Sequence, residues 1–224
     1  MPRDLTVAVE GHGVQGQLSR PPQPGAPATY RVSAMRPSAH PFQMRVKAAN
    51  FSETFNGTLV SVLWDVTVFK WSQATDPRTN IDLWRKLASD KTAVSTQVKR
   101  LSLQFGNGGP GDQPSLKPLA TAELGSNHFG LIAQSSLPLS AGTWTFSTLS
   151  DDGIRVTVDD KPVINNWTWH GPTRNTGEIT LDRDKTVNIK VEYFEIDGYA
   201  VLDLGITPHP KIMSPEKKLQ TAAR

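Results

Sequence analysis

The stretch Ser150-Asp151-Asp152-Gly153 separates two runs in which apolar and polar residues alternate. The runs cover residues 142–149 and 154–159, and period-two alternation on both sides of Asp-Asp-Gly predicts two antiparallel strands joined by a tight acidic turn. The residues that share one face are Trp144, Phe146 and Thr148 in the first run and Ile154, Val156 and Val158 in the second. Because successive side chains of an extended chain point to opposite faces, the carboxylates of Asp151 and Asp152 normally diverge. An unusual backbone conformation is required if both carboxylates are to contact the same bound atom.

The composition is that of a soluble globular protein with many turns. The 224 residues suit one elaborated domain, or a domain with a small appendage. Hydrophobic residues make up 37% and charged residues 20% of the chain, which is ordinary for a folded domain. Seventeen Gly and seventeen Pro favour turns and short strands over helices, and the absence of Cys excludes disulfides and thiolate metal sites.

Several classes of function find no support in the sequence. The formal net charge is only +3, and the sequence contains no dense basic cluster with a recognisable motif, so nucleic-acid binding is not expected. The sequence contains no run of about 18 apolar residues, so no membrane span is expected either. Residues 1–4 lead into no apolar segment, so no signal peptide is expected in this chain.

Catalytic motifs are also missing. The five His residues, at positions 12, 40, 128, 170 and 209, are scattered without metal-ligand spacing. Neither a nucleophile elbow nor a phosphate loop occurs. Glycoside hydrolysis needs two carboxylates about 5–9.5 Å apart, and adjacent aspartates pointing the same way would lie closer than that. The sequence therefore predicts a protein that is not an enzyme.

The first half of the chain is predicted to be mostly β, with one helix. Asp76 followed by Pro77 predicts a helix start, and apolar residues at three- and four-residue spacing extend the helix to Ser89. Asn56-Gly57 predicts a turn, after which residues 58–71 form a central strand or two strands around a bulge. The other expected segments are strands at 5–9, 30–35, 42–48 and 98–105, a Pro-rich linker at 20–27, and a Gly/Pro loop at 106–118.

The second half is predicted to be a series of short strands. They are expected at 129–137, 143–149, 154–159, 162–166, 177–182, 186–194 and 199–206. Such a series predicts an all-β fold, an antiparallel, jelly-roll-like β-sandwich with one short helix and an N-terminal β extension. The expected division is an extension and linker at 1–28, a sandwich at 29–207 and a disordered tail at 208–224.

Residues 144–156, Trp-Thr-Phe-Ser-Thr-Leu-Ser-Asp-Asp-Gly-Ile-Arg-Val, resemble the signature hairpin of the protective-antigen-type (PA-fourteen) β-sandwich domain family. Residues 158–167 and 191–202 resemble the strands that follow this hairpin in the family. The specific match covers about 129–206, whereas 58–128 fit more loosely and 1–57 lie outside it or form an extension. The resemblance implies a secreted or cell-surface β-sandwich that binds glycans in many of its members.

In the lectin-like branch of this family, adjacent aspartates joined by a cis peptide hold a calcium ion that also ligates sugar hydroxyls. The resemblance thus makes Asp151 and Asp152 the calcium candidates, and calcium takes six to eight oxygen ligands. Those lectins also use an Asn and backbone carbonyls from a later loop. The matching loop here, residues 194–198, contains no Asn, so Asp197 or Glu195 would have to substitute.

Simpler interpretations stand beside these. Asp and Gly are ordinary residues of tight turns, so the acidic stretch can also be a turn without a metal. Trp167 is expected in the core, whereas Trp169 can be buried or can stack on a sugar ring. His170 is expected to be a loop residue. The predicted ligand-binding residues are Asp151, Asp152, Asn166, Trp169 and Glu195, and the predicted calcium ligands are Asp151, Asp152 and Asp197.

The sequence therefore predicts a non-catalytic carbohydrate-binding module with calcium as its candidate cofactor and a glycan or polysaccharide as its partner. The alternative is a structural or assembly module of a larger exported protein, packed against a neighbouring domain and binding no sugar. A glycan-binding signal that depends on calcium would distinguish the first from the second.

Overall fold

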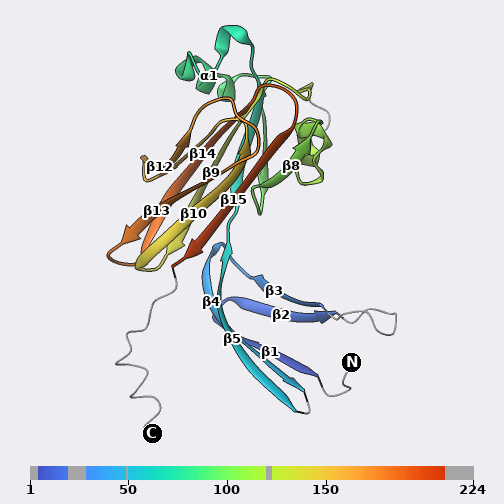
Figure 1. Ribbon diagram of the computed structural model, residues 1–224, viewed down its shortest axis with the longest axis vertical. Helices are drawn as coiled ribbons and strands as arrows, with labels where there is room; N and C mark the ends of the chain where they lie inside the picture. Colours follow the sequence, from blue (N-terminus) through green and yellow to red (C-terminus); the bar gives the residue numbers. More distant parts are fainter. Residues whose placement is uncertain (1–4, 20–28, 49, 120–122, 210–224) are drawn as a thin grey trace.

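The computed structural model describes residues 5–19, 29–48, 50–119 and 123–209. Ten strands from β6 onward form two packed antiparallel sheets (Figure 1). The four-stranded sheet has the order β13-β10-β15-β8, and the six-stranded sheet has the order β12-β11-β14-β9-β6-β7. The strands are β6 (Trp64–Lys70), β7 (Val94–Val98), β8 (Ser102–Gly106), β9 (Phe129–Leu139), β10 (Gly142–Asp151), β11 (Ile154–Val158), β12 (Lys161–Asn166), β13 (Thr173–Leu181), β14 (Lys185–Glu195) and β15 (Ala200–Pro208). The predicted antiparallel β-sandwich is confirmed.

The core lies between the two sheets and follows the alternation in the sequence. On β10, Trp144 and Phe146 are buried, and on β14 Val187, Ile189 and Val191 are buried on the inward face. These residues belong to one continuous hydrophobic cluster that includes both sheets. Two sheets whose inner faces interdigitate in this way exclude water from the whole length of the sandwich.

A smaller hydrophobic cluster lies on the outer face of the six-stranded sheet, under the one α-helix of the described residues. Phe69 of β6 and Phe194 of β14 belong to it, together with Trp71 and Trp84. Trp84 lies on α1 (Ile81–Lys86), which continues as a 3-10 turn over Leu87–Ser89. The helix is therefore anchored by aromatic contacts such as that between Phe69 and Trp84, whose ring centroids are 5.0 Å apart.

The predicted start of this helix at Pro77 is wrong. Asn80 caps α1, since its side-chain oxygen accepts a hydrogen bond from the Leu83 N–H. Asp76 instead accepts hydrogen bonds from the backbone N–H and the guanidinium of Arg78. A short polar side chain can hydrogen-bond to the backbone two residues on, so Asp76 forms a turn where the sequence pattern suggested a cap.

Glu192 connects α1 to the sheet beneath it. Its carboxylate is 1% exposed and accepts hydrogen bonds of 2.6 and 2.8 Å from the Arg85 guanidinium of α1. Lys190 lies 3.1 Å from the same carboxylate, and Arg155 lies 3.8 Å away. Burial alone would raise the pKa of Glu192, but the hydrogen bonds from Arg85 and the charge of Lys190 hold it below its usual value.

Replacing the guanidinium is expected to loosen the helix. Arg85→Met should lower the free energy of unfolding by about 1.5 kcal/mol, because the buried carboxylate loses two charge-assisted hydrogen bonds while Lys190 remains. Urea unfolding followed by tryptophan fluorescence measures the change. Lys86→Met, an exposed position on the same helix, is the matched control; an equal loss in both variants would contradict this role for Arg85.

The N-terminal β extension consists of two small sheets (Figure 1). One has the order β1-β4-β5 and the other pairs β2 with β3. The strands are β1 (Thr6–Glu10), β2 (Val14–Ser19), β3 (Thr29–Ala34), β4 (Ser38–Ala48) and β5 (Phe51–Ser61). The predicted boundary after residue 28 therefore needs correction: the strands of 29–61 pair with those of 6–19, so the division by sheet pairing falls after Ser61. Ala39 and Val60 pack against the sandwich core.

Two further local predictions differ from the structure, and for residues 58–71 the structure decides between the two alternatives. Asn56-Gly57 is not a turn but lies within β5, where Gly57 pairs with Phe42 and leaves room for its ring; a Cβ on Gly57 would come within 2.8 Å of it. Residues 58–71 belong to two strands, as the second alternative predicted: β5 ends at Ser61 and β6 begins at Trp64. The predicted strand 98–105 is split between β7 and β8, and the loop at 106–118 contains 3-10 turns at Pro110–Asp112 and Pro114–Leu119.

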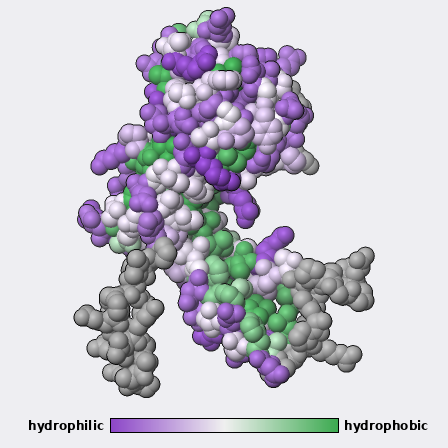
Figure 2. Space-filling view, in the orientation of Figure 1, coloured by the Kyte–Doolittle hydropathy of each residue, from purple (hydrophilic) through white to green (hydrophobic). Residues whose placement is uncertain are grey.

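The predicted linker and most of the predicted tail lie outside the described residues. Pro208, assigned to the tail, is the last residue of β15. Figure 2 shows hydrophobic surface over the extension, where Met35, Phe51 and Phe55 are exposed.

Candidate cation and ligand site

Two strands from different sheets end side by side at one end of the sandwich, the end that carries α1 (Figure 1). β10 ends at Asp151 and β14 ends at Glu195. Ligand atoms of Asp151, Asp152 and Glu195 all lie within 4.8 Å of one another. The exposed fractions of the three residues are 6%, 1% and 0%, so this carboxylate cluster is buried.

The tight turn between β10 and β11 sits directly against β14. The peptide bond between Asp151 and Asp152 is cis, as the family resemblance implies. The Phe194 N–H donates to the Gly153 carbonyl over 3.0 Å, and a Cβ on Gly153 would lie 2.1 Å from the Phe194 ring. Only glycine permits this close approach, which presses the turn against the last residues of β14.

Asp152 joins three segments of the chain. Its Oδ1 accepts from the His170 N–H over 3.1 Å, and its Oδ2 accepts from the Ile196 N–H over 2.8 Å. One carboxylate thus holds together the turn, the loop between β12 and β13, and the loop after β14. Its lone pairs are only partly used by these two bonds, because an ionised carboxylate has about four acceptor positions.

Glu195 is placed by the alternation along β14, since it lies on the same inward face as Tyr193. The Tyr193 hydroxyl donates to the Asp151 carbonyl and lies 3.3 Å from Glu195 Oε2. Glu195 Oε1 is buried and has no hydrogen-bond partner in the described residues. A buried carboxylate oxygen left without a partner is costly, so this atom marks a place where a ligand would be stabilised.

The electrostatics of the cluster favour uptake of positive charge. Burial, with the neighbouring charge of Asp152, raises the pKa of Asp151 to about 6. Burial and the charges of Asp152 and Asp151 raise the pKa of Glu195 to about 9. Burial also raises the pKa of Asp152, although the N–H groups of Ile196 and His170 oppose the rise. Within the described part of the chain, no Lys or Arg lies within 4.0 Å of these carboxylates.

The other predicted site residues lie around the cluster, not in it. Asp197 is exposed in the loop after β14 and does not join the three carboxylates, although its charge raises the pKa of Asp152 and Glu195. Trp169 is 63% exposed and precedes His170, which binds Asp152. Asn166 is half-buried, donates to Asn175 over 3.4 Å and accepts from Thr168, so its amide is engaged between β12 and β13.

Trp167 packs on the outer cluster under α1, not in the core between the sheets where it was expected. Its ring centroid lies 4.8 Å from that of Phe194 and 5.3 Å from that of Trp84. Its indole N–H donates to the Pro77 carbonyl over 2.9 Å. Trp167 therefore connects the loop bearing Trp169 to the segment that precedes α1.

The sequence pattern missed the role of Tyr193 and of two backbone N–H groups. The spacing of two between Tyr193 and Glu195 is the signal that both share a face of β14. The N–H groups of His170 and Ile196 carry no sequence signal, because any residue supplies them.

No described helix is long and apolar enough to cross a membrane.

Comparison with known proteins agrees with the β-sandwich fold. The family model described as the PA14 domain matches residues 122–218. The anti-sigma-I factor RsgI3 of Acetivibrio thermocellus is 36% identical over 58 residues, which is 26% of this chain and 9% of that protein. Among solved structures, a PA14 sugar-binding domain from an RTX adhesin is similar at 21% identity and a TM-score of 0.52, covering 67% of this chain and 91% of that one. The PA14 domain of the MpAFP antifreeze protein is similar at 18% identity and a TM-score of 0.51, covering 68% of this chain and 84% of that one. Residues 122–218 thus resemble the PA14 domain, and solved PA14 domains share the β-sandwich fold described above.

Proposed function

We propose that this chain is a non-catalytic glycan-binding module in which Asp151, Asp152 and Glu195 hold a calcium ion. The observation that carries the proposal is the buried carboxylate cluster, in which three acidic groups converge with no Lys or Arg of the described residues within 4.0 Å. If all three groups are ionised, their charges repel one another at this separation, which is one reason why Glu195 keeps its proton; a divalent cation would offset most of that repulsion and take the place of the proton.

The donor set suits a hard cation. All three side chains offer carboxylate oxygens, which calcium and magnesium prefer, and the described chain supplies no thiolate or imidazole within the group. Three carboxylates leave several of the six to eight positions around calcium for backbone carbonyls, water or the hydroxyls of a sugar. Glu195 then takes the place that an Asn of the later loop has in the lectin-like branch of the family.

A glycan as the partner is supported by the surroundings of the cluster. Trp169 presents an exposed indole from the loop whose His170 N–H binds Asp152, and an exposed aromatic ring can stack on the apolar face of a sugar. The RTX adhesin domain of the same fold is described as sugar-binding. We infer that ligand hydroxyls approach the cation on the side of this loop. A secreted or cell-surface location would suit such a site, because extracellular calcium modules bind at about 10⁻⁴–10⁻³ M.

The second candidate function is a structural or assembly module, and the burial of the cluster favours it. Asp152 and Glu195 are 1% and 0% exposed, so a cation held mainly by them would have little contact with a ligand in solution. In that case calcium would stabilise the fold of the loops, and the exposed apolar residues of the extension would be the surface used for assembly.

A glycan array probed with and without chelator separates the two candidates. Calcium-dependent binding that is lost in Asp152→Asn supports the glycan-binding module, and Trp169→Ala should weaken that binding about tenfold if the indole stacks on sugar. Glu53→Gln, an exposed carboxylate of the extension, is the matched control. If calorimetry shows that calcium binds, and no glycan on the array binds with or without calcium, the structural module is favoured.

A further inference from the structure

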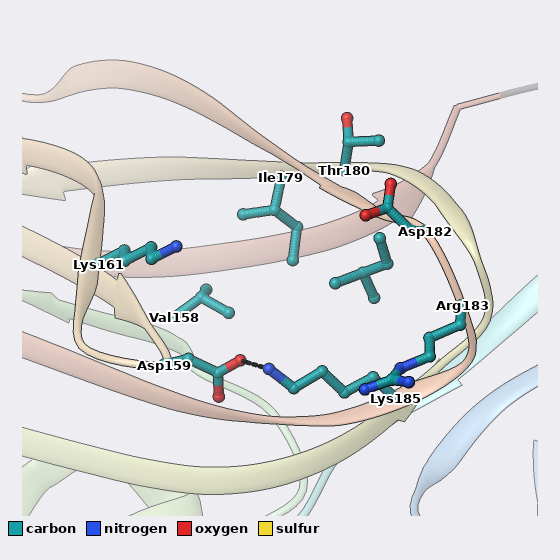
Figure 3. A pocket seen from close by; sticks show the side chains of 9 residues that line it. Val158, Asp159, Lys161, Ile179, Thr180, Asp182, Arg183 and Lys185 are labelled. Carbon is teal, nitrogen blue, oxygen red and sulfur yellow. Dashed lines mark hydrogen bonds and ion pairs between the residues drawn. The ribbon is translucent and has the colours of Figure 1, made fainter.

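A cavity of about 500 Å³ opens at the opposite end of the sandwich, between the edge strands of the two sheets (Figure 3). The edge strands β12 and β13 touch near Gly177, where a Cβ would come within 2.1 Å of the Val163 carbonyl. Beyond that contact the cavity separates Lys161 at the start of β12 from Leu181 at the end of β13. The carboxylate cluster lies at the other end of β14, about 30 Å away along the strand.

The floor of this cavity is apolar. Val158 of β11 is buried, and Ile179 and Leu181 of β13 are half-buried. All three belong to, or pack against, the main hydrophobic cluster. An apolar group placed there would remove water from this surface at about 25 cal/mol per Å² of area.

The rim of the cavity is basic. Lys161 reaches over the floor from one side, and Arg183 and Lys185 lie on the other side (Figure 3). Asp159 and Asp182 are the acidic residues that line it. The rim thus carries three positive and two negative side chains, but their charges are not equally available.

Asp159 is already neutralised by its own neighbours. Its Oδ2 pairs with the Lys185 ammonium over 2.7 Å, and its Oδ1 accepts from the Asn188 N–H over 2.9 Å. Asp159 and Asp160 both have positive φ, at 47° and 63°, as a two-residue hairpin turn requires, so the position of Asp159 is set by the turn. Among the described residues, no carboxylate lies within 4.0 Å of Lys161 or Arg183.

We propose that this cavity binds a small organic anion, with its carboxylate between Lys161 and Arg183 and its apolar body on Val158, Ile179 and Leu181. With Asp159 paired to Lys185, Lys161 and Arg183 outnumber the remaining carboxylate, Asp182, so the rim has a net positive charge that selects the acid. The floor selects an apolar body over a simple ion. This site is separate from the carboxylate cluster and does not depend on calcium or on glycan binding.

The proposal is tested with naphthalene-2-carboxylate as the probe and naphthalene-2-methanol as its uncharged counterpart. Methyl NMR of the full chain is expected to show shifts confined to Val158, Ile179 and Leu181, with the carboxylate binding about fivefold more tightly than the alcohol. Raising the salt concentration should reduce that difference, because exposed charges are screened.

The variant Lys161→Gln/Arg183→Gln should bind the carboxylate and the alcohol equally, whereas Lys86→Gln on α1 should behave as the unchanged chain. An unaltered methyl spectrum of the free double variant shows that it is folded. Equal binding of the two probes by the unchanged chain, a preference that survives in the double variant, or shifts centred elsewhere would each overturn the proposal.

Discussion

In calcium-free buffer, the protein is expected to become less stable as the pH rises from 5 to 9. Glu195 has a pKa of about 9 in the folded protein, against an ordinary value of 4.5. Between these values the folded chain holds a proton that the unfolded chain has released. Stability therefore falls with rising pH, by at most about 1.4 kcal/mol per pH unit for one such group.

The groups that face Glu195 explain the direction of this effect. Burial raises the pKa of Glu195 most, the charges of Asp152, Asp151 and Asp197 raise it further, and the hydrogen bond with Tyr193 lowers it. Asp151 adds to the loss in the lower part of the range, because its pKa is raised from 3.8 to about 6. The stabilising contribution of both protonated carboxyls is thus complete below about pH 4 and is lost as the pH passes through their folded values.

Urea unfolding in the presence of a chelator, at pH 5.5, 7.0 and 8.5, measures the slope. Glu195→Gln should flatten it, since an amide resembles the protonated carboxyl and does not titrate. Glu53→Gln, far from the cluster, should keep the full slope. Constant or increasing stability between pH 6 and pH 8.5 in the unchanged chain would show that Glu195 is ionised throughout, contrary to this account.

Calcium is expected to raise the unfolding temperature by about 5–11 °C at a free concentration 100-fold above its dissociation constant. Such a concentration adds about 2.7 kcal/mol to the folded state. In a chain of this size each kcal/mol corresponds to about 2–4 °C. The increase should be larger at pH 8 than at pH 5.5, because the carboxylates must release their protons before they bind the cation.

Differential scanning fluorimetry with and without calcium tests this prediction directly. Asp152→Asn and Glu195→Gln should lose most of the calcium-induced shift, and Asp197→Asn should keep it, since Asp197 lies outside the cluster. A shift that is the same in all variants would place the calcium elsewhere on the chain. No shift at 10 mM calcium would remove the cation from the proposed function and leave the cluster as a buried acidic group of the fold.

Much of the sandwich could be predicted from the sequence because its strands are exposed to solvent on one face. The alternation along residues 142–149 and 186–191 reports this directly, and β10 and β14 lie where it predicts strands. The failures are places where a distant contact overrides a local signal. Asn56-Gly57 reads as a turn, but pairing with Phe42 across the sheet keeps it within β5.

The candidate site was predictable only in part for a related reason. Asp151 and Asp152 are marked by their adjacency and by the family resemblance, whereas the choice between Glu195 and Asp197 depends on where β14 ends. The strand continues through Glu195, which keeps this residue on the inward face, and the chain leaves the sheet before Asp197. Spacing along the sequence does not determine that end point to within two residues.

The chain enters the sandwich at the start of β6 and leaves it at the end of β15, and both points lie far from the carboxylate cluster. β6 begins at Trp64 and β15 ends at Pro208, and Figure 1 shows both of these ends on the side of the extension, away from α1. The carboxylate cluster, although buried, therefore lies at the end of the sandwich opposite to these two strand ends. A glycan bound at the proposed site would approach from that end, on the side away from the N-terminal extension.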